Sequence, residues 1–255
     1  MANSLWTRRW VVALKLLILA WILSPAAGAS AQLQNLYPNF FQLKPDVLDV
    51  VAFGGGFGSE KYGTIQEGLQ LDQRITRYIG AVGRATGYQL WIGDNFDNPL
   101  APGTGHRPRL NFGRLQGGVE FDLYPGTTLF VLGGGDVGDS TGAVIEGDGS
   151  SWLLTHSRHP VNFSFSASHD YENHVTASEI DLRAVVSSTE TYLITAGGGG
   201  AIYQGGVISS AEGQGGPDLG IYFRRYALGL ALQGGYGNAG GFGQLSIIKQ
   251  WDFHE

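Results

Sequence analysis

Residues 159–170 read HPVNFSFSASHD and change polarity at every position from Val161 to Ser168. Apolar side chains occupy the odd positions from Val161 to Ala167, and polar ones occupy the even positions from Asn162 to Ser168. An extended chain points successive side chains to opposite faces, so this pattern predicts a strand between an apolar and a polar environment. No helical period of useful length occurs along the chain. We therefore expect an all-β protein.

Eleven further segments share this character and are separated by turn-forming residues. The twelve predicted strands cover residues 48–58, 63–75, 78–91, 109–123, 127–137, 142–154, 160–169, 175–186, 191–203, 217–224, 226–236 and 241–253. Strands of soluble proteins average about five or six residues, whereas most of these are about twice as long. Long strands in an even number are typical of membrane barrels. The predicted fold is a closed up-and-down antiparallel transmembrane β-barrel of about 12 strands.

The first 31 residues have the composition of a secretory signal peptide. Arg8 and Arg9 precede an apolar run over residues 10–23, and residues 29–31 (ASA) form a small-residue cleavage site. No later apolar run reaches the length of about 18 residues that a spanning helix needs. We predict a cleaved signal at 1–31, a periplasmic N-terminal segment at 32–47, the barrel at 48–253 and a short tail at 254–255.

The charge of the exported chain is strongly acidic. Beyond residue 31 the chain has 13 Lys and Arg residues and 22 Asp and Glu residues. This balance argues against nucleic acid as a partner. The chain has no cysteine, so disulfides cannot stabilise it.

Connection lengths predict the orientation of the barrel. Short connections are expected around residues 76, 124–126, 155–159, 187–190 and 225, while the alternate set includes the two longest, 92–108 and 204–216. Outer-membrane barrels place short turns in the periplasm and longer loops outside. With an even strand count, both termini then lie on the periplasmic side.

On each predicted strand the polar side chains alternate with the apolar ones and point to the opposite face. We predict that this polar face lines the lumen, because an unpaired charge in lipid is costly. This set comprises Gln66, Gln70, Asp72, Arg74, Arg84, Arg114, Gln116, Glu120, Asp122, Glu179, Asp181, Arg183, Arg224 and Asp252. Its mixed charges allow two interpretations. They either pair across a narrow lumen and close it, or line a wet pore and select ions.

The last predicted strand, GQLSIIKQWDF over residues 243–253, resembles the aromatic-ended final strand of Gram-negative outer-membrane β-barrels. Members of this superfamily usually end on that aromatic residue, and this chain continues with His254 and Glu255. The resemblance covers the whole mature chain and implies contact with outer-membrane lipid, with lipopolysaccharide and with the barrel assembly machinery. It also implies that Trp251 and Phe253 belong to an interfacial aromatic girdle and to the assembly signal.

Three motifs resemble sites of chemistry. Residues 133–138 (GGGDVG) match a dinucleotide fingerprint, but a turn and a strand follow where a helix is required, so no cofactor is expected. Ser168, His169, Glu172 and His174 could suggest a lipid hydrolase, yet Ser168 and His169 are adjacent in one strand and point to opposite faces. A set of carboxylates expected near the outer rim could bind divalent ions, although solvated loop charge is the simpler interpretation: Asp94, Asp97, Glu146, Asp148 and Asp170.

These observations favour a small outer-membrane channel, or the barrel component of an envelope transport system. The alternative is a non-transporting structural or surface-interaction barrel whose lumen is closed by ion pairs. A lipid-modifying enzyme is a distant third, and we expect no enzymatic activity.

Overall fold

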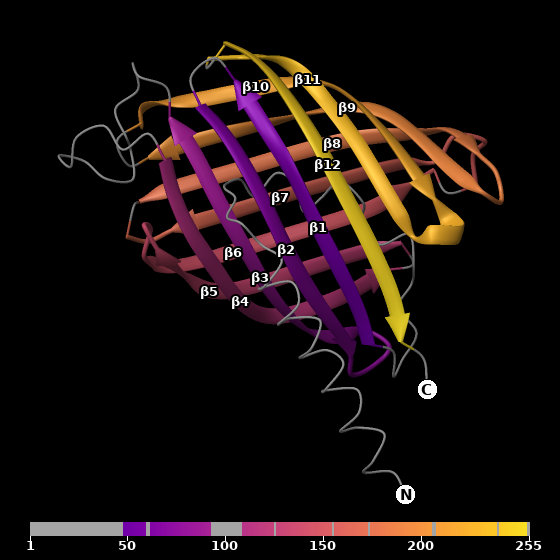
Figure 1. Cartoon of the computed structure of the whole chain (residues 1–255). Coiled ribbons are helices and arrows are strands. Elements are labelled where there is room, and N and C mark those ends of the chain that lie inside the picture. Colours follow the sequence, from indigo (N-terminus) through magenta and orange to yellow (C-terminus); the bar gives the residue numbers. More distant parts are fainter. Residues whose placement is uncertain are drawn as a thin grey trace, which may run out of the picture.

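The computed structural model describes residues 48–59, 62–92, 109–124, 126–154, 156–172, 174–205, 208–238 and 240–253. They form one closed barrel of twelve antiparallel strands (Figure 1). The strands are β1 (Leu48–Ser59), β2 (Tyr62–Arg74), β3 (Ile79–Ile92), β4 (Arg109–Tyr124), β5 (Thr127–Gly138), β6 (Gly142–Leu153), β7 (Val161–Asp170), β8 (Val175–Ser188), β9 (Tyr192–Gly205), β10 (Ile208–Phe223), β11 (Leu228–Gly237) and β12 (Gly240–Phe253). The predicted signal peptide, N-terminal segment and tail lie outside the described residues.

Each strand pairs with its neighbours in the chain, and β1 closes the sheet against β12. In the closing pair Leu48 lies opposite Phe253, and Ser59 lies opposite Phe242. Closure leaves no strand with an unpaired edge. The prediction of a closed up-and-down barrel is confirmed. We call the rim where β1 begins and β12 ends the lower rim, as it lies in Figure 1, and the opposite rim the upper rim.

The observed strands match the predicted ones within a few residues, except for β10. It begins at Ile208 rather than 217, so the predicted long loop at 204–216 is wrong and only residues 206–207 separate β9 from β10. The glycines of this segment look like chain breakers, but they allow close backbone contact: a Cβ on Gly216 would lie 2.2 Å from the carbonyl oxygen of Gly234. One of the two long loops that predicted the orientation of the barrel is therefore absent. The other, at 92–108, lies outside the described residues from 93 onward.

The outer face of the barrel is apolar. On β8 the outward side chains of Ile180 and Leu182 are 56% and 51% exposed. Large apolar or aromatic residues are similarly exposed on most of the other strands and in turns, for example Ile65, Leu115, Val131, Ile145, Ile202, Leu219, Leu232, Leu245 and Ile247. Soluble monomers rarely expose contiguous apolar surface beyond a few hundred Å². This face is built to meet an apolar medium.

Exposed aromatic side chains mark both rims of the barrel. Tyr78, Tyr226 and Trp251 lie at the lower rim, in two turns and near the end of β12. Tyr171 and Tyr236 lie at the upper rim, after β7 and near the end of β11. Membrane barrels carry such aromatic girdles where lipid headgroups meet water. Lys249 Nζ lies 5.1 Å from the Trp251 ring centroid and donates to the backbone carbonyls of Tyr226 and Gln250, so its charge reaches the lower rim from the outer face.

The inner face of the barrel is largely polar. The serines of β7 lie inside, with Ser164 and Ser166 only 1% and 3% exposed, while the Phe163 and Phe165 side chains have the opposite parity and are only partly covered. Among the described residues, the buried apolar cluster formed by Val185, Leu193 and Tyr222 is small. Most buried side chains of the described residues are polar or charged, although apolar ones such as Phe53, Phe57 and Leu132 are buried as well.

Candidate functional site: the charged lumen

Most of the predicted lumen residues lie on the inner face. They are Gln66, Gln70, Asp72 and Arg74 on β2, Arg84 on β3, Arg114, Gln116, Glu120 and Asp122 on β4, and Glu179, Asp181 and Arg183 on β8. The prediction that Arg224 lines the lumen is wrong. Because β10 ends at Phe223, Arg224 lies exposed in the short 3-10 turn Arg224–Tyr226 and donates to Ser188 Oγ at 3.0 Å. The side chain of Asp252 lies outside the described part of the structure.

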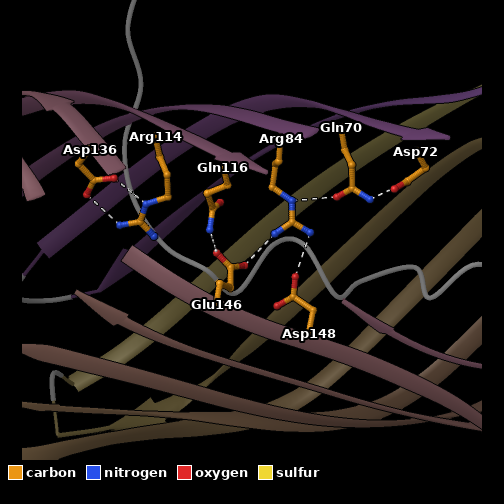
Figure 2. Close-up of polar contacts among 8 residues, drawn as sticks. All are labelled: Gln70, Asp72, Arg84, Arg114, Gln116, Asp136, Glu146 and Asp148. Atoms are coloured by element: carbon orange, nitrogen blue, oxygen red, sulfur yellow. Dashed lines mark hydrogen bonds and ion pairs between the residues drawn. The ribbon is translucent and has the colours of Figure 1, made fainter. Parts of the chain in front are cut away.

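Arg84 is the centre of the largest polar network (Figure 2). Its Nη1 donates to Glu146 Oε1 at 2.8 Å and its Nη2 to Asp148 Oδ2 at 2.9 Å. Arg84 is on β3 and both carboxylates are on β6, so these bonds pass over β4 and β5 through the interior. Breaking a buried pair of this kind is strongly destabilising because it leaves an uncompensated charge.

Glutamine side chains extend this network on both sides (Figure 2). Gln70 accepts from Arg84 Nε at 2.8 Å and donates to Asp72 Oδ2 at 2.7 Å. Gln116 donates to Glu146 Oε2 at 2.8 Å. We call Gln70, Asp72, Arg84, Gln116, Glu146 and Asp148 the β3–β6 network.

Arg114 forms a separate pair beside this network (Figure 2). Its Nε and Nη2 donate to the two carboxylate oxygens of Asp136 at 2.7 and 2.9 Å. The guanidinium also lies 5.3 Å from the Tyr88 ring centroid, and Tyr88 stacks on Phe112 with 4.8 Å between centroids. A planar guanidinium is suited to bidentate and stacked contacts together.

Arg74 serves two carboxylates near the lower rim. It forms an ion pair with Asp122, and its Nη2 lies 3.7 Å from Glu120 Oε1. Thr128 Oγ1 donates to Asp122 Oδ1 at 3.0 Å. Asp122 is therefore the better satisfied of the two acids.

Arg183 connects β8 to β10. It donates to Asp218 on β10 and, at 3.0 Å, to Asp181 Oδ2 on its own strand. Between these strands lies β9, whose register places Gly197 opposite both Arg183 and Asp218. A Cβ on neighbouring Gly199 would lie 1.7 Å from Asp181 Oδ1, so this strand must be bare of side chains where the cluster crosses it. We call Glu179, Asp181, Arg183 and Asp218 the β8–β10 cluster.

Carboxylates outnumber arginines in the described lumen. Its ten carboxylates are Asp49, Asp72, Glu120, Asp122, Asp136, Glu146, Asp148, Glu179, Asp181 and Asp218. Its four arginines are Arg74, Arg84, Arg114 and Arg183. All are buried apart from Asp122 and Arg114, whose side chains are 21% and 11% exposed. The described lumen therefore holds more carboxyl groups than its four arginines can pair one to one.

Several of these acids were missed or misplaced from the sequence. Glu146 and Asp148 were expected near the outer rim, but they are buried partners of Arg84. Both alternate with Ile145, Gly147 and Gly149, and Ile145 is exposed on the outer face. Strand parity therefore places Glu146 and Asp148 on the inner face. The strand parity of Asp136 and Asp218 carried the same signal. Of the other rim carboxylates, Asp94 and Asp97 lie outside the described residues, and Asp170 ends β7 at the upper rim.

The remaining motifs from the sequence lie in ordinary strands of the barrel. Residues 133–138 lie within β5. His169 Nδ1 is 2.9 Å from Thr176 Oγ1, and Ser168 has the opposite parity, in register with Glu146. No group of three or more His, Cys, Asp or Glu side chains within the described ranges is arranged to hold a metal ion.

Comparison with known proteins places the fold. No protein-family model matches the sequence, and no curated protein is significantly similar to it. An outer-membrane channel from Pseudomonas putida F1 superposes with a TM-score of 0.55 at 9% identity, covering 85% of this chain and 100% of that one. The chain has the fold of an outer-membrane β-barrel. The β domain of the Bordetella autotransporter BrkA is also similar, with a TM-score of 0.51 at 11% identity, over 82% of this chain and 100% of that one. At these identities the likeness concerns architecture alone.

Proposed function

We propose that this protein spans the outer membrane of a Gram-negative bacterium as a small channel that passes cations. The observation that carries the proposal is the excess of carboxylates over arginines in the described lumen. The proposal includes no enzymatic activity and no cofactor.

The outer face supports the membrane location. Exposed apolar side chains lie on most of the strands, and exposed aromatic side chains lie at both rims. In hydrocarbon only helices and closed barrels satisfy every backbone amide. Outer-membrane lipid and lipopolysaccharide are the proposed surroundings, reached after export by a cleaved signal at 1–31 and insertion by the barrel assembly machinery.

The charge of the lumen supports cation passage. A buried charge without a partner costs several kcal/mol, so in a dry lumen the acids that the four arginines leave unpaired would be protonated and neutral. Water and mobile cations remove that cost. Rings of Asp and Glu side chains are the usual basis of cation selectivity in pores.

Planar-bilayer recording of refolded protein tests the proposal. We expect stable unit openings in protein whose gel migration is slower after boiling than before, as for a folded barrel. A persistent absence of openings, or recovery of the native protein as a soluble periplasmic monomer, would contradict it.

A second candidate is a structural or surface-interaction barrel with a closed lumen. The ion pairs from β3 to β6 and from β8 to β10 favour it, because they cross the interior and are almost fully buried. Replacing Arg84 or Arg183 should then create openings that the wild-type protein lacks. A wild-type protein that already conducts rules this candidate out.

A further inference from the structure

Three lumen carboxylates share one hydrogen-bond register around the barrel. Glu120 on β4 lies opposite Phe130, which lies opposite Asp148 on β6. Asp148 lies opposite Ser166, and Ser166 opposite Glu179 on β8. The acids thus occupy alternate strands of a single row, which we call the carboxylate row: Glu120, Asp148 and Glu179.

Each acid of the carboxylate row is buried and incompletely satisfied. Glu120, Asp148 and Glu179 are 1%, 2% and 5% exposed. Both carboxylate oxygens of Glu120, Oδ1 of Asp148 and Oε2 of Glu179 have no hydrogen-bond partner within the described structure. Buried polar atoms nearly always have a hydrogen-bond partner, so the lack of partners for these oxygens needs a physical explanation.

The described arginines serve the carboxylate row only in part. Arg74 is 3.7 Å from Glu120 and is shared with Asp122. Arg84 bonds Asp148 through Oδ2 and divides its charge with Glu146. Within the described ranges no Lys, Arg or His nitrogen lies within 4.0 Å of Glu179, whose neighbour Asp181 takes Arg183. All three sites therefore have an acceptor left for a further cation.

We propose that the carboxylate row is a file of weak binding sites for small inorganic cations such as Na⁺. This inference rests on the proposed cation passage and names the side chains that the ions meet. Carboxylate oxygens, with the Ser166 hydroxyl between two of them, are ligands for hard cations. A single acid on every second strand binds an ion loosely, and conduction requires sites that an ion can leave again.

Sodium-23 NMR of the full barrel in detergent tests binding without requiring conduction. The variant combines Glu120→Gln, Asp148→Asn and Glu179→Gln, which keep the side-chain volumes. The control is Glu190→Gln, at an exposed position in the β8–β9 turn. We expect wild-type protein and the control to broaden the sodium resonance, and the triple variant to lose that broadening.

Equal broadening by the triple variant and the wild-type protein would overturn the inference. If the triple variant does not fold, the three single variants decide, because each should lose part of the broadening. Unchanged broadening in all three is again a negative result.

Bilayer recording separates this inference from the proposed function. If wild-type protein passes cations but the triple variant keeps the same selectivity and broadening, the row is not the site and the channel proposal stands. If wild-type protein passes no cations, the channel proposal fails, and the NMR result alone decides whether the row binds them.

Discussion

Arg84 on β3 and Glu146 on β6 are joined by a 2.8 Å hydrogen bond although two strands of the sheet separate them. The side chains meet because both strands point these residues inward across a narrow lumen. Together with the bond from Arg183 to Asp218, this contact links strands that are not neighbours in the sheet through charged groups. Charged side chains consequently organise the interior of this barrel. Substitution of a single one of them should change the stability and the permeability of the barrel.

Arg84→Met should destabilise the barrel by about 3–5 kcal/mol, because it leaves Glu146 and Asp148 buried without their cation. Urea unfolding of protein refolded into vesicles, followed by tryptophan fluorescence, measures the change. Arg225→Met, in the exposed turn after β10, should shift stability by no more than about 0.5 kcal/mol. Equal effects of the two substitutions would show that the β3–β6 network does not stabilise the fold.

Gly199→Ala should destabilise the barrel by about 1–3 kcal/mol through overpacking. Its Cβ would stand 1.7 Å from Asp181 Oδ1 and would displace the β8–β10 cluster. Gly243→Ala is the matched control, because a Cβ there has no heavy atom within 4 Å. The same urea measurement compares them, and a neutral Gly199→Ala would mean that Asp181 does not lie over β9.

Cysteine accessibility should follow strand parity. The chain has no native cysteine, so each introduced thiol is the sole target of a reagent confined to water. In vesicles we expect Arg114→Cys and Asp122→Cys, at the two charged lumen positions whose side chains are least buried, to react and their neighbours Leu115→Cys and Phe121→Cys to be protected. The reverse pattern would place the charged face against lipid and would exclude a charged lumen.

Phe253→Ser should lower the amount of assembled barrel in the outer membrane, because the final aromatic residue belongs to the strand that resembles an assembly signal. Comparing boiled and unboiled samples on gels measures the folded fraction. Tyr236→Ser removes an exposed aromatic at the upper rim and should leave assembly nearly unchanged. Normal levels of the Phe253 variant would show that assembly does not depend on this residue.

Strand parity made much of the fold predictable, because side chains alternate with a period of two whatever lies beyond the strand. It placed Arg84 and Glu120 correctly on the inner face. It failed where glycines such as Gly216 resembled breakers but in fact permit close strand contact. It also failed for the pairing of Arg84 with Glu146, since contacts across a barrel depend on its stagger and tilt, which no single strand records.

The reversal potential of a single channel in a KCl gradient tests the central claim most directly. An acidic lumen predicts a potential close to the equilibrium potential of K⁺, and Glu120→Lys combined with Asp122→Lys should move the potential of the protein that still folds toward that of Cl⁻. A wild-type potential on the chloride side, or one that the double substitution leaves unchanged, would contradict the account.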